Sequence, residues 1–201
     1  MTAVTEELRS LQLRLCQAYG VEPEPHVGPF VELIEGSASR EVLYVRSSGD
    51  DLEVRLYLPR EAVGEPRDRT LDHVCQLVEG VSHFVLIAER ARRDLPTTRL
   101  ELELQAEVDK FVVLLGPTEH LSACGVRARA ALLRQALFER VRFVHAPSTR
   151  KGERYRIANR LAHGFTSRLS DELARRRDVT GALRRFHAAG PTEKLALARA
   201  A

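Results

Sequence analysis

Residues 70–115, TLDHVCQLVEGVSHFVLIAERARRDLPTTRLELELQAEVDKFVVLL, decide the fold, because they contain two apolar segments long enough to form the middle of a core. In the first segment, apolar residues recur at steps of three and four from Leu71 to Ala88, which is the spacing of one helix face. Further apolar residues widen this face until little of the circumference is polar, as is typical of a buried helix. Thr70 is a good N-cap and Pro96 stops the segment, so we predict a core helix between them.

The second segment, residues 98–115, has two readings, because Leu and Glu alternate near its start as they would in a strand. Thr98 and Glu101 have the spacing of a capping box, a signature of a helix start. The apolar residues also continue at helical spacing, and the uninterrupted length exceeds that of a typical strand. We therefore predict a second core helix, which ends at Gly116.

Shorter elements precede these two helices. Residues 4–19 have the pattern of an amphipathic helix of about four turns. Residues 41–59 form a β-hairpin pattern, with turn-forming residues at 47–50. Residues 30–36 are a possible first strand, so we predict a small antiparallel sheet of two or three strands. A sheet of only two or three short strands is not stable by itself in water, so we expect it to pack against helices.

The rest of the chain is predicted to be helical. A third core helix is expected from about Glu119 to Val144, with Thr118 as a plausible N-cap, followed by a loop at residues 145–152. A long helix follows over roughly residues 153–177. Its apolar seam continues through Gly164, which favours one helix over a helix-turn-helix pair. Two short helices, around residues 182–188 and 193–200, complete the chain.

These elements predict an α+β protein with an N-terminal helix, a small sheet and then a mainly helical bundle. We expect a single domain over residues 1–201 with three parts. The parts are a helix plus sheet (1–68), the core helices (69–144) and a basic helical C-terminal part (145–201).

The composition, with 44% hydrophobic and 29% charged residues, is that of a globular protein. No N-terminal segment resembles a signal peptide, and the longest apolar runs are too short to span a bilayer. A cytoplasmic location without membrane contact is therefore expected. Cys16, Cys75 and Cys124 lack CxxC spacing, so we expect reduced, buried thiols.

Charge is distributed unevenly along the chain. Residues 1–126 carry 13 basic and 22 acidic side chains, a net charge of −9, whereas residues 127–201 carry 18 and 6, a net charge of +12. A coding bias toward arginine would raise its content everywhere, so it does not explain this difference. The asymmetry predicts an acidic partner for the C-terminal part, which is a nucleic acid, another protein or the chain's own N-terminal part.

Arginines are the candidate binding residues of this C-terminal part, because a guanidinium group can bind a phosphate or carboxylate through two hydrogen bonds. Arginines on a helix are also often its solvated face, with their stems covering apolar surface. The candidates are Arg154, Arg156, Arg160, Arg168, Arg175, Arg176 and Arg177.

One constellation raises the question of a metal site. Gln76, Glu79 and His83 share a face of the first core helix, and Glu103 and Glu107 share a face of the second. Carboxylate-bridged sites in helical bundles use Glu-x-x-His at i,i+3, whereas Glu79 and His83 are four residues apart. Because this ligand spacing is missing, no metal is expected.

No sequence motif indicates catalysis or a cofactor. GxSxG, Walker A, GxGxxG and HExxH are all absent from the sequence, so no catalytic residue and no cofactor are predicted.

We therefore expect a non-enzymatic binding or regulatory protein that acts through protein–protein contacts. Its broad apolar helix faces and an open sheet edge suggest a protein partner or a homodimer. Nucleic-acid binding by the basic C-terminal helices is the alternative.

Overall fold

The computed structural model describes residues 3–36, 40–48 and 51–200, and its α+β architecture confirms the predicted class. The described residues group into two compact units. Unit 1 comprises residues 1–17 and 21–95, and unit 2 comprises residues 18–20 and 96–201.

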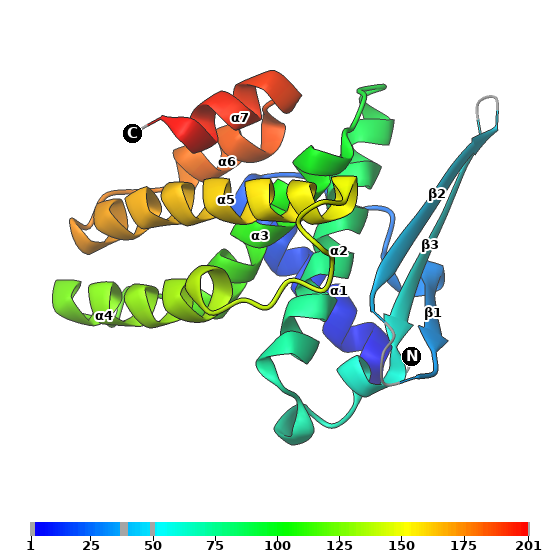
Figure 1. Ribbon diagram of the computed structural model, residues 1–201, viewed down its shortest axis with the longest axis horizontal. Helices are drawn as coiled ribbons and strands as arrows, with labels where there is room; N and C mark the ends of the chain where they lie inside the picture. The colour runs from blue at the N-terminus through cyan, green and yellow to red at the C-terminus, as the bar shows by residue number, and fades with distance from the viewer. Residues whose placement is uncertain (1–2, 37–39, 49–50, 201) are drawn as a thin grey trace. The chain divides into compact units, whose positions relative to one another are not determined.

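The sheet of unit 1 has the strand order β1-β3-β2 (Figure 1). The predicted hairpin of β2 (Val42–Ser48) and β3 (Asp51–Pro59) is antiparallel, with Val45 opposite Val54. Two residues of its predicted turn, Gly49 and Asp50, lie outside the described residues.

The prediction of a wholly antiparallel sheet is wrong, because β1 (Val31–Ile34) runs parallel to β3. In the sheet, β2 takes the far position from β1, about two strand spacings or 9.6 Å away. The hairpin then returns β3 into the gap, where it pairs with both neighbours. The four residues of β1 meet only Leu56–Pro59, so the outer part of the hairpin has two strands and extends beyond β1 (Figure 1).

The sheet packs against α2 (Leu71–Arg92), the predicted first core helix. The predicted N-cap is confirmed, since the Thr70 hydroxyl accepts a hydrogen bond from the backbone of His73 at 3.2 Å. A methyl group on Gly80 would lie 2.9 Å from a methyl carbon of Leu56, so this glycine permits the close approach of β3. Because Leu56 is fully buried, this contact anchors the sheet to the helix.

The predicted N-terminal helix, α1 (Ala3–Tyr19), holds the proline-rich connector that follows it. The buried amide of Gln12 donates hydrogen bonds to the carbonyls of Pro23 (3.0 Å) and Pro25 (2.8 Å), and it accepts one from the Val27 amide (2.9 Å). One side chain thus satisfies three backbone groups of a segment without regular secondary structure.

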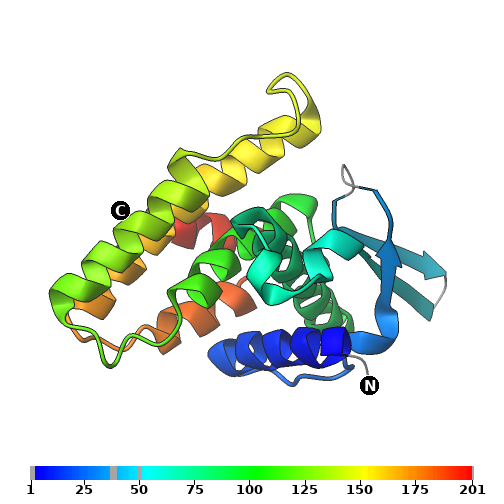
Figure 2. The same ribbon diagram turned by 90° about the horizontal axis from the view of Figure 1, so that it is seen from below.

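Unit 2 is helical. The ambiguous second segment forms α3 (Arg99–Leu115), and the capping box of Thr98 and Glu101 is present in both directions. The long predicted helix is also confirmed as a single helix that passes through Gly164. The helices that follow α3 are α4 (Ala123–Arg134), α5 (Arg150–Ala174, the long helix), α6 (Thr180–Ala188) and α7 (Pro191–Arg199). The long helix α5 packs against α3, α4 and α7, and Figure 2 shows α4 alongside it.

The predicted third core helix, residues 119–144, is too long at both ends. The N-cap is Ser122, whose hydroxyl accepts a hydrogen bond from Gly125 at 3.1 Å, and Thr118 lies in the preceding turn. After α4, one wider π-helical turn ends at Glu139. Val144, expected in the apolar seam, is instead 70% exposed, because it lies in the loop after the helix.

The expectation of three buried thiols is wrong for one of them. Cys16 and Cys75 are buried, whereas Cys124 is exposed in the first turn of α4, and none of these three described residues forms a disulfide.

One helix, α2, is long and apolar enough by composition to cross a membrane. Of its most apolar 18-residue window, 61% is buried within the structure, and core helices of folded proteins also meet these criteria.

We predict that Gly152→Ala destabilises the protein strongly, because an added methyl group would overlap the backbone carbonyl of Ala146, which cannot rotate away. Gly181→Ala in α6 is the matched control. Nothing lies within 4 Å of its added methyl group, so the higher helix propensity of Ala should stabilise by roughly 0.5–1 kcal/mol. Chemical denaturation measures both free energies of unfolding, and equal effects of the two substitutions would contradict the described packing.

Candidate functional site

Several of the predicted arginines bond to the chain itself. The Arg154 guanidinium lies 3.2 Å from the Glu103 carboxylate. Arg156 donates to the carbonyl of His145 at 3.0 Å, and Arg168 donates to that of Leu197 at 2.7 Å. These side chains tie α5 to neighbouring segments of unit 2, which is a structural use of their charge.

The remaining arginines do not converge on one site. Arg175 and Arg177 both bond to the Glu172 carboxylate, at 3.1 and 2.9 Å, and Arg176 donates to the carbonyl of Glu119 at 3.4 Å. Arg160 is exposed and makes no hydrogen bond or ion pair with other residues in the described part of the chain. The seven candidates spread over roughly 35 Å of helix and its end, so the structure does not gather them into one pocket.

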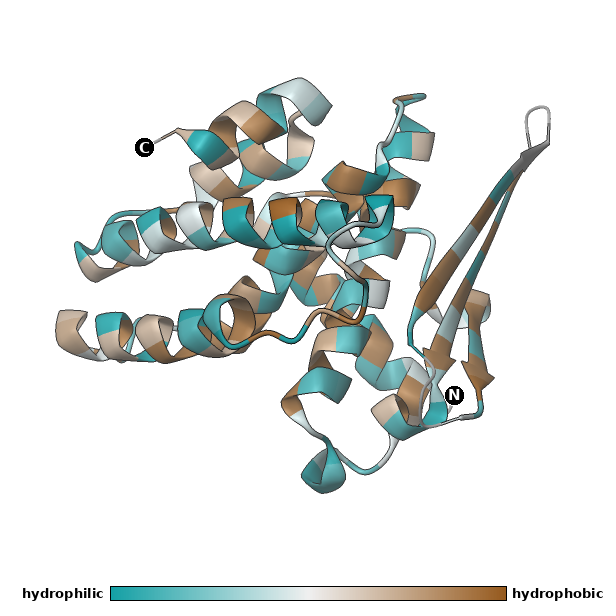
Figure 3. Ribbon diagram, viewed as in Figure 1, coloured by the Kyte–Doolittle hydropathy of each residue, from teal (hydrophilic) through white to brown (hydrophobic). Residues whose placement is uncertain are grey.

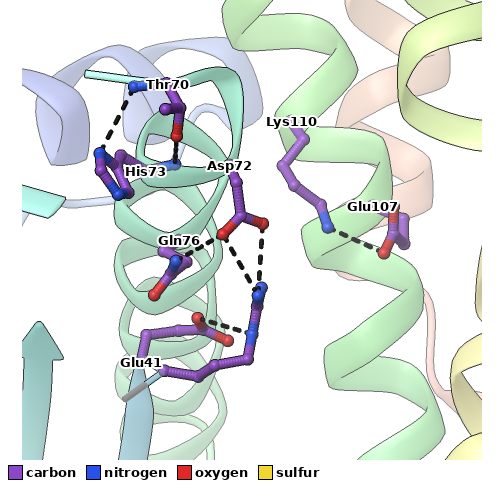
Figure 4. Close-up of polar contacts among 8 residues, drawn as sticks. Glu41, Thr70, Asp72, His73, Gln76, Glu107 and Lys110 are labelled. Carbon is purple, nitrogen blue, oxygen red and sulfur yellow. Dashed lines mark hydrogen bonds and ion pairs between the residues drawn. The ribbon is translucent and has the colours of Figure 1, made fainter. Parts of the chain in front are cut away.

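A polar cluster in unit 1 is the most developed chemical site. Asp72, Gln76, Glu79 and His83 follow each other at steps of four, three and four residues, so they share one face of α2. Arg40, located before β2, reaches this face and lies 3.2 and 3.3 Å from the two carboxylate oxygens of Asp72 (Figure 4). The cluster thus joins the sheet side of unit 1 to its core helix.

Glu41 adds a second carboxyl group to the cluster. Its side chain is only 5% exposed and lies 3.8 Å from the Arg40 guanidinium. Burial, the negative charge of Glu79 and a hydrogen bond between the two side chains raise the pKa of Glu41 to about 9. Two carboxyl groups this close cannot both be ionised at little cost, so the pair retains a proton at neutral pH.

The amide of Gln76 is half satisfied. Its nitrogen donates to Asp72 at 2.8 Å, whereas its buried oxygen has no hydrogen-bond partner among the described residues. In the view of Figure 4, the nitrogen faces Asp72 and the oxygen points toward the end of the cluster where Glu41 lies. One turn further along the helix, ligand-type atoms of Glu79 and His83 lie within 4.8 Å of each other. Carboxylate, imidazole and amide groups are all metal ligands.

Sequence reasoning identified the α2 side of this cluster but missed Glu41 and Arg40. The sequence gives no signal for them, because they lie outside any helical pattern, just before a strand. Only the folding of β2 against α2 brings their side chains to residues that are more than 30 positions away.

Unit 2 contains a second buried polar network, centred on Lys194 of α7. This side chain is fully buried, and its ammonium group donates to Gln105 at 2.8 Å and lies 3.8 Å from Glu101. Gln105 in turn donates to Asp109 at 2.8 Å. Separately, Lys110 lies 2.8 Å from Glu107 on α3 (Figure 4).

The network continues to Tyr19, whose hydroxyl donates a very short hydrogen bond to Asp109. Burial and the adjacent Asp109 carboxylate raise the pKa of Tyr19 well above its usual range. The ring of Tyr19 stacks on that of His187, with centroids 4.3 Å apart. The network therefore links residues from α1, α3, α6 and α7. Its buried donors and acceptors chiefly satisfy one another's hydrogen-bonding needs.

The third feature is the free edge of the sheet. β2 pairs only with β3, so its other edge carries backbone groups without a strand partner in the described sheet. The hairpin also exposes large apolar side chains, and Figure 3 shows apolar residues along much of both strands. These exposed residues are Val42, Tyr44, Val45 and Leu52.

Comparison with known proteins returned no matching family model, no matching curated protein and no matching solved structure.

We predict that the stability of unit 1 falls as the pH rises from about 4.5 toward 9. Over this interval an unfolded Glu41 loses its proton, whereas the folded pair, with its pKa of about 9, retains it. Glu41→Gln should therefore flatten the pH dependence and raise Tm at pH 8 by roughly 2–4 °C per kcal/mol gained. Thermal denaturation at several pH values tests this, and an unchanged slope would contradict the shared proton.

Lys194→Met is expected to destabilise the protein by roughly 3–5 kcal/mol, because it leaves the buried carboxylate of Glu101 without its cation. Lys194→Met combined with Glu101→Gln should recover most of this loss, since the amide carries no charge and retains the helix cap. Urea denaturation of the wild type, both single variants and the double variant gives the coupling energy. Additive effects would show that the two charges do not interact.

Proposed function

We propose that this protein is a non-enzymatic binding protein that forms a homodimer by pairing its β2 strands. The exposed apolar edge of the β2–β3 hairpin carries the proposal. A free strand edge of this kind readily accepts another strand, because its unpaired backbone groups are already aligned for hydrogen bonding.

The outer part of the hairpin has little support within the chain. β1 covers only the last four residues of β3, and an isolated two-stranded ribbon is marginally stable in water. Val42 and Tyr44, which are two positions apart and so share one face of β2, are 52% and 41% exposed. A strand added at the β2 edge would complete a wider sheet and remove apolar surface from water.

A second copy of the chain fits this edge by its charge pattern. Antiparallel self-pairing centred on Val45 places Tyr44 of each copy opposite Arg46 of the other. This arrangement brings cations next to aromatic rings and avoids placing two arginines face to face. It is an isologous contact, which closes after two subunits.

The arginines of α5 support the alternative of nucleic-acid binding less well. Most of them bond to backbone carbonyls or carboxylates of unit 2, so contact with phosphates would first require breaking those bonds. The arginines carry the required positive charge, but most of their guanidinium groups are already engaged in bonds within unit 2. We therefore carry forward the protein-binding proposal.

The test measures molecular mass by light scattering over a wide concentration range. The wild type should approach twice the 22.6 kDa chain mass, whereas Val45→Lys should remain a monomer because it places a charge at the centre of the proposed edge. Leu132→Lys is the matched control, since Leu132 is a large apolar residue, 69% exposed, on α4. It should dimerise like the wild type.

A wild type that stays monomeric at all concentrations would overturn the proposal. Dimers that survive Val45→Lys but dissociate with Leu132→Lys would assign the contact to α4 and would also overturn it. Circular dichroism of each variant verifies that the fold is intact.

A further inference from the structure

We propose that the basic loop of unit 2, residues 140–151, binds the surface of membranes that contain anionic lipids. This inference is independent of the proposed dimer, because the dimer edge, β2, belongs to unit 1. The expectation of no membrane contact rests on the lack of a spanning run or a signal peptide, and attachment to a membrane surface requires neither.

Contacts with α5 determine which side chains of the basic loop face water. The Arg156 guanidinium lies over the Phe143 ring, 4.5 Å from its centroid, and donates a hydrogen bond to the His145 carbonyl at 3.0 Å. Phe143 and His145 are half-buried, whereas the alternating residues Arg142 and Val144 are exposed. One row of side chains therefore holds the loop to α5, and the other row faces outward. Figure 2 shows this loop, in yellow, at one end of the α4–α5 pair.

The outward row presents apolar surface. Of the large apolar side chains that the structure describes, Val144 is the most exposed, at 70%. Val141, three residues before it, is also exposed, and Figure 3 shows apolar residues in this loop. A single exposed valine is common on a protein surface, so its significance depends on what surrounds it.

Cations surround these valines. The basic loop contains four basic residues and no acidic residue. All four are exposed, and within the part of the chain that the structure describes none of them forms an ion pair. Their charge is therefore available to a partner, unlike that of the arginines at the end of α5, which bond to Glu172. The four residues are Arg140, Arg142, Arg150 and Lys151.

An anionic membrane accounts for both features of the basic loop. The four cations are attracted to the negative headgroups, and the exposed valines leave water when they enter the boundary between headgroups and acyl chains. A nucleic acid would use the same cations but would leave Val144 in water. The combination of positive charge and exposed apolar side chains therefore favours the membrane.

The test measures cosedimentation of the full chain with lipid vesicles at low salt. We expect binding to vesicles made from an equal mixture of phosphatidylserine and phosphatidylcholine, and no measurable binding to vesicles of phosphatidylcholine alone. Salt at about 1 M, which screens charges beyond about 3 Å, should weaken the binding. Equal binding to both kinds of vesicle would overturn the proposal, and so would binding to a DNA or RNA oligonucleotide without binding to anionic vesicles.

Charge reversal in the loop tests the role of the cations. Arg140→Glu combined with Arg142→Glu should weaken vesicle binding by at least about 25-fold, because each cation near an anionic leaflet strengthens binding roughly fivefold. The matched control combines Arg9→Glu on α1 with Arg199→Glu on α7, since both arginines are exposed and the net charge changes equally. It should retain most of the binding. Equal losses in the two double variants would reveal a general effect of net charge and would overturn the assignment.

A tryptophan reporter tests the insertion of the loop directly. The wild type contains no tryptophan, so Val144→Trp introduces a single fluorophore. Its emission should shift to shorter wavelength when anionic vesicles are added, because indole rings settle at the membrane interface. Leu13→Trp, at an exposed leucine of α1, is the matched control and should show no shift. An unchanged emission in Val144→Trp, or equal shifts in both variants, would overturn the proposal.

Discussion

The pairing of buried charge is the constraint on which both units depend. Each core helix carries ionisable side chains inside the structure, where an unpaired charge is strongly unfavourable. On α2, the buried side chain of Glu79 shares a hydrogen bond with Glu41, a residue 38 positions earlier in the chain. On α3, Gln105 and Glu101 meet Lys194 from a helix near the C-terminus.

This constraint explains the unusual composition of α3. Its apolar seam, which includes Leu104, Val108 and Phe111, is flanked by polar positions that are also buried. On one side Glu101, Gln105 and Asp109 follow each other at steps of four residues, and they face the network of Lys194 and Tyr19. The Leu–Glu alternation at the start of α3 thus reflects a helix buried around most of its circumference, and it does not reflect a strand.

The edge of the hairpin and the polar cluster of α2 are of opposite physical character. At the hairpin, apolar side chains and backbone groups face water, and a second strand would cover them. In the α2 cluster, carboxyl groups and an amide oxygen are removed from water. Neither feature depends on the arginines of α5, whose charge is largely used within unit 2.

The sequence alone determined most of the helices and the N-caps of the two core helices, because these depend on local signals. Thr70 and Thr98 cap their helices as expected, and the apolar seam of α5 continues through Gly164. The tertiary structure decided what local patterns do not encode. β1 became parallel because β3 filled the gap beside it, and Glu41 reached Glu79 because β2 packs near α2. These outcomes depend on which distant segments meet, since the energy of a buried charge is set by its neighbours in space and not by its neighbours in sequence.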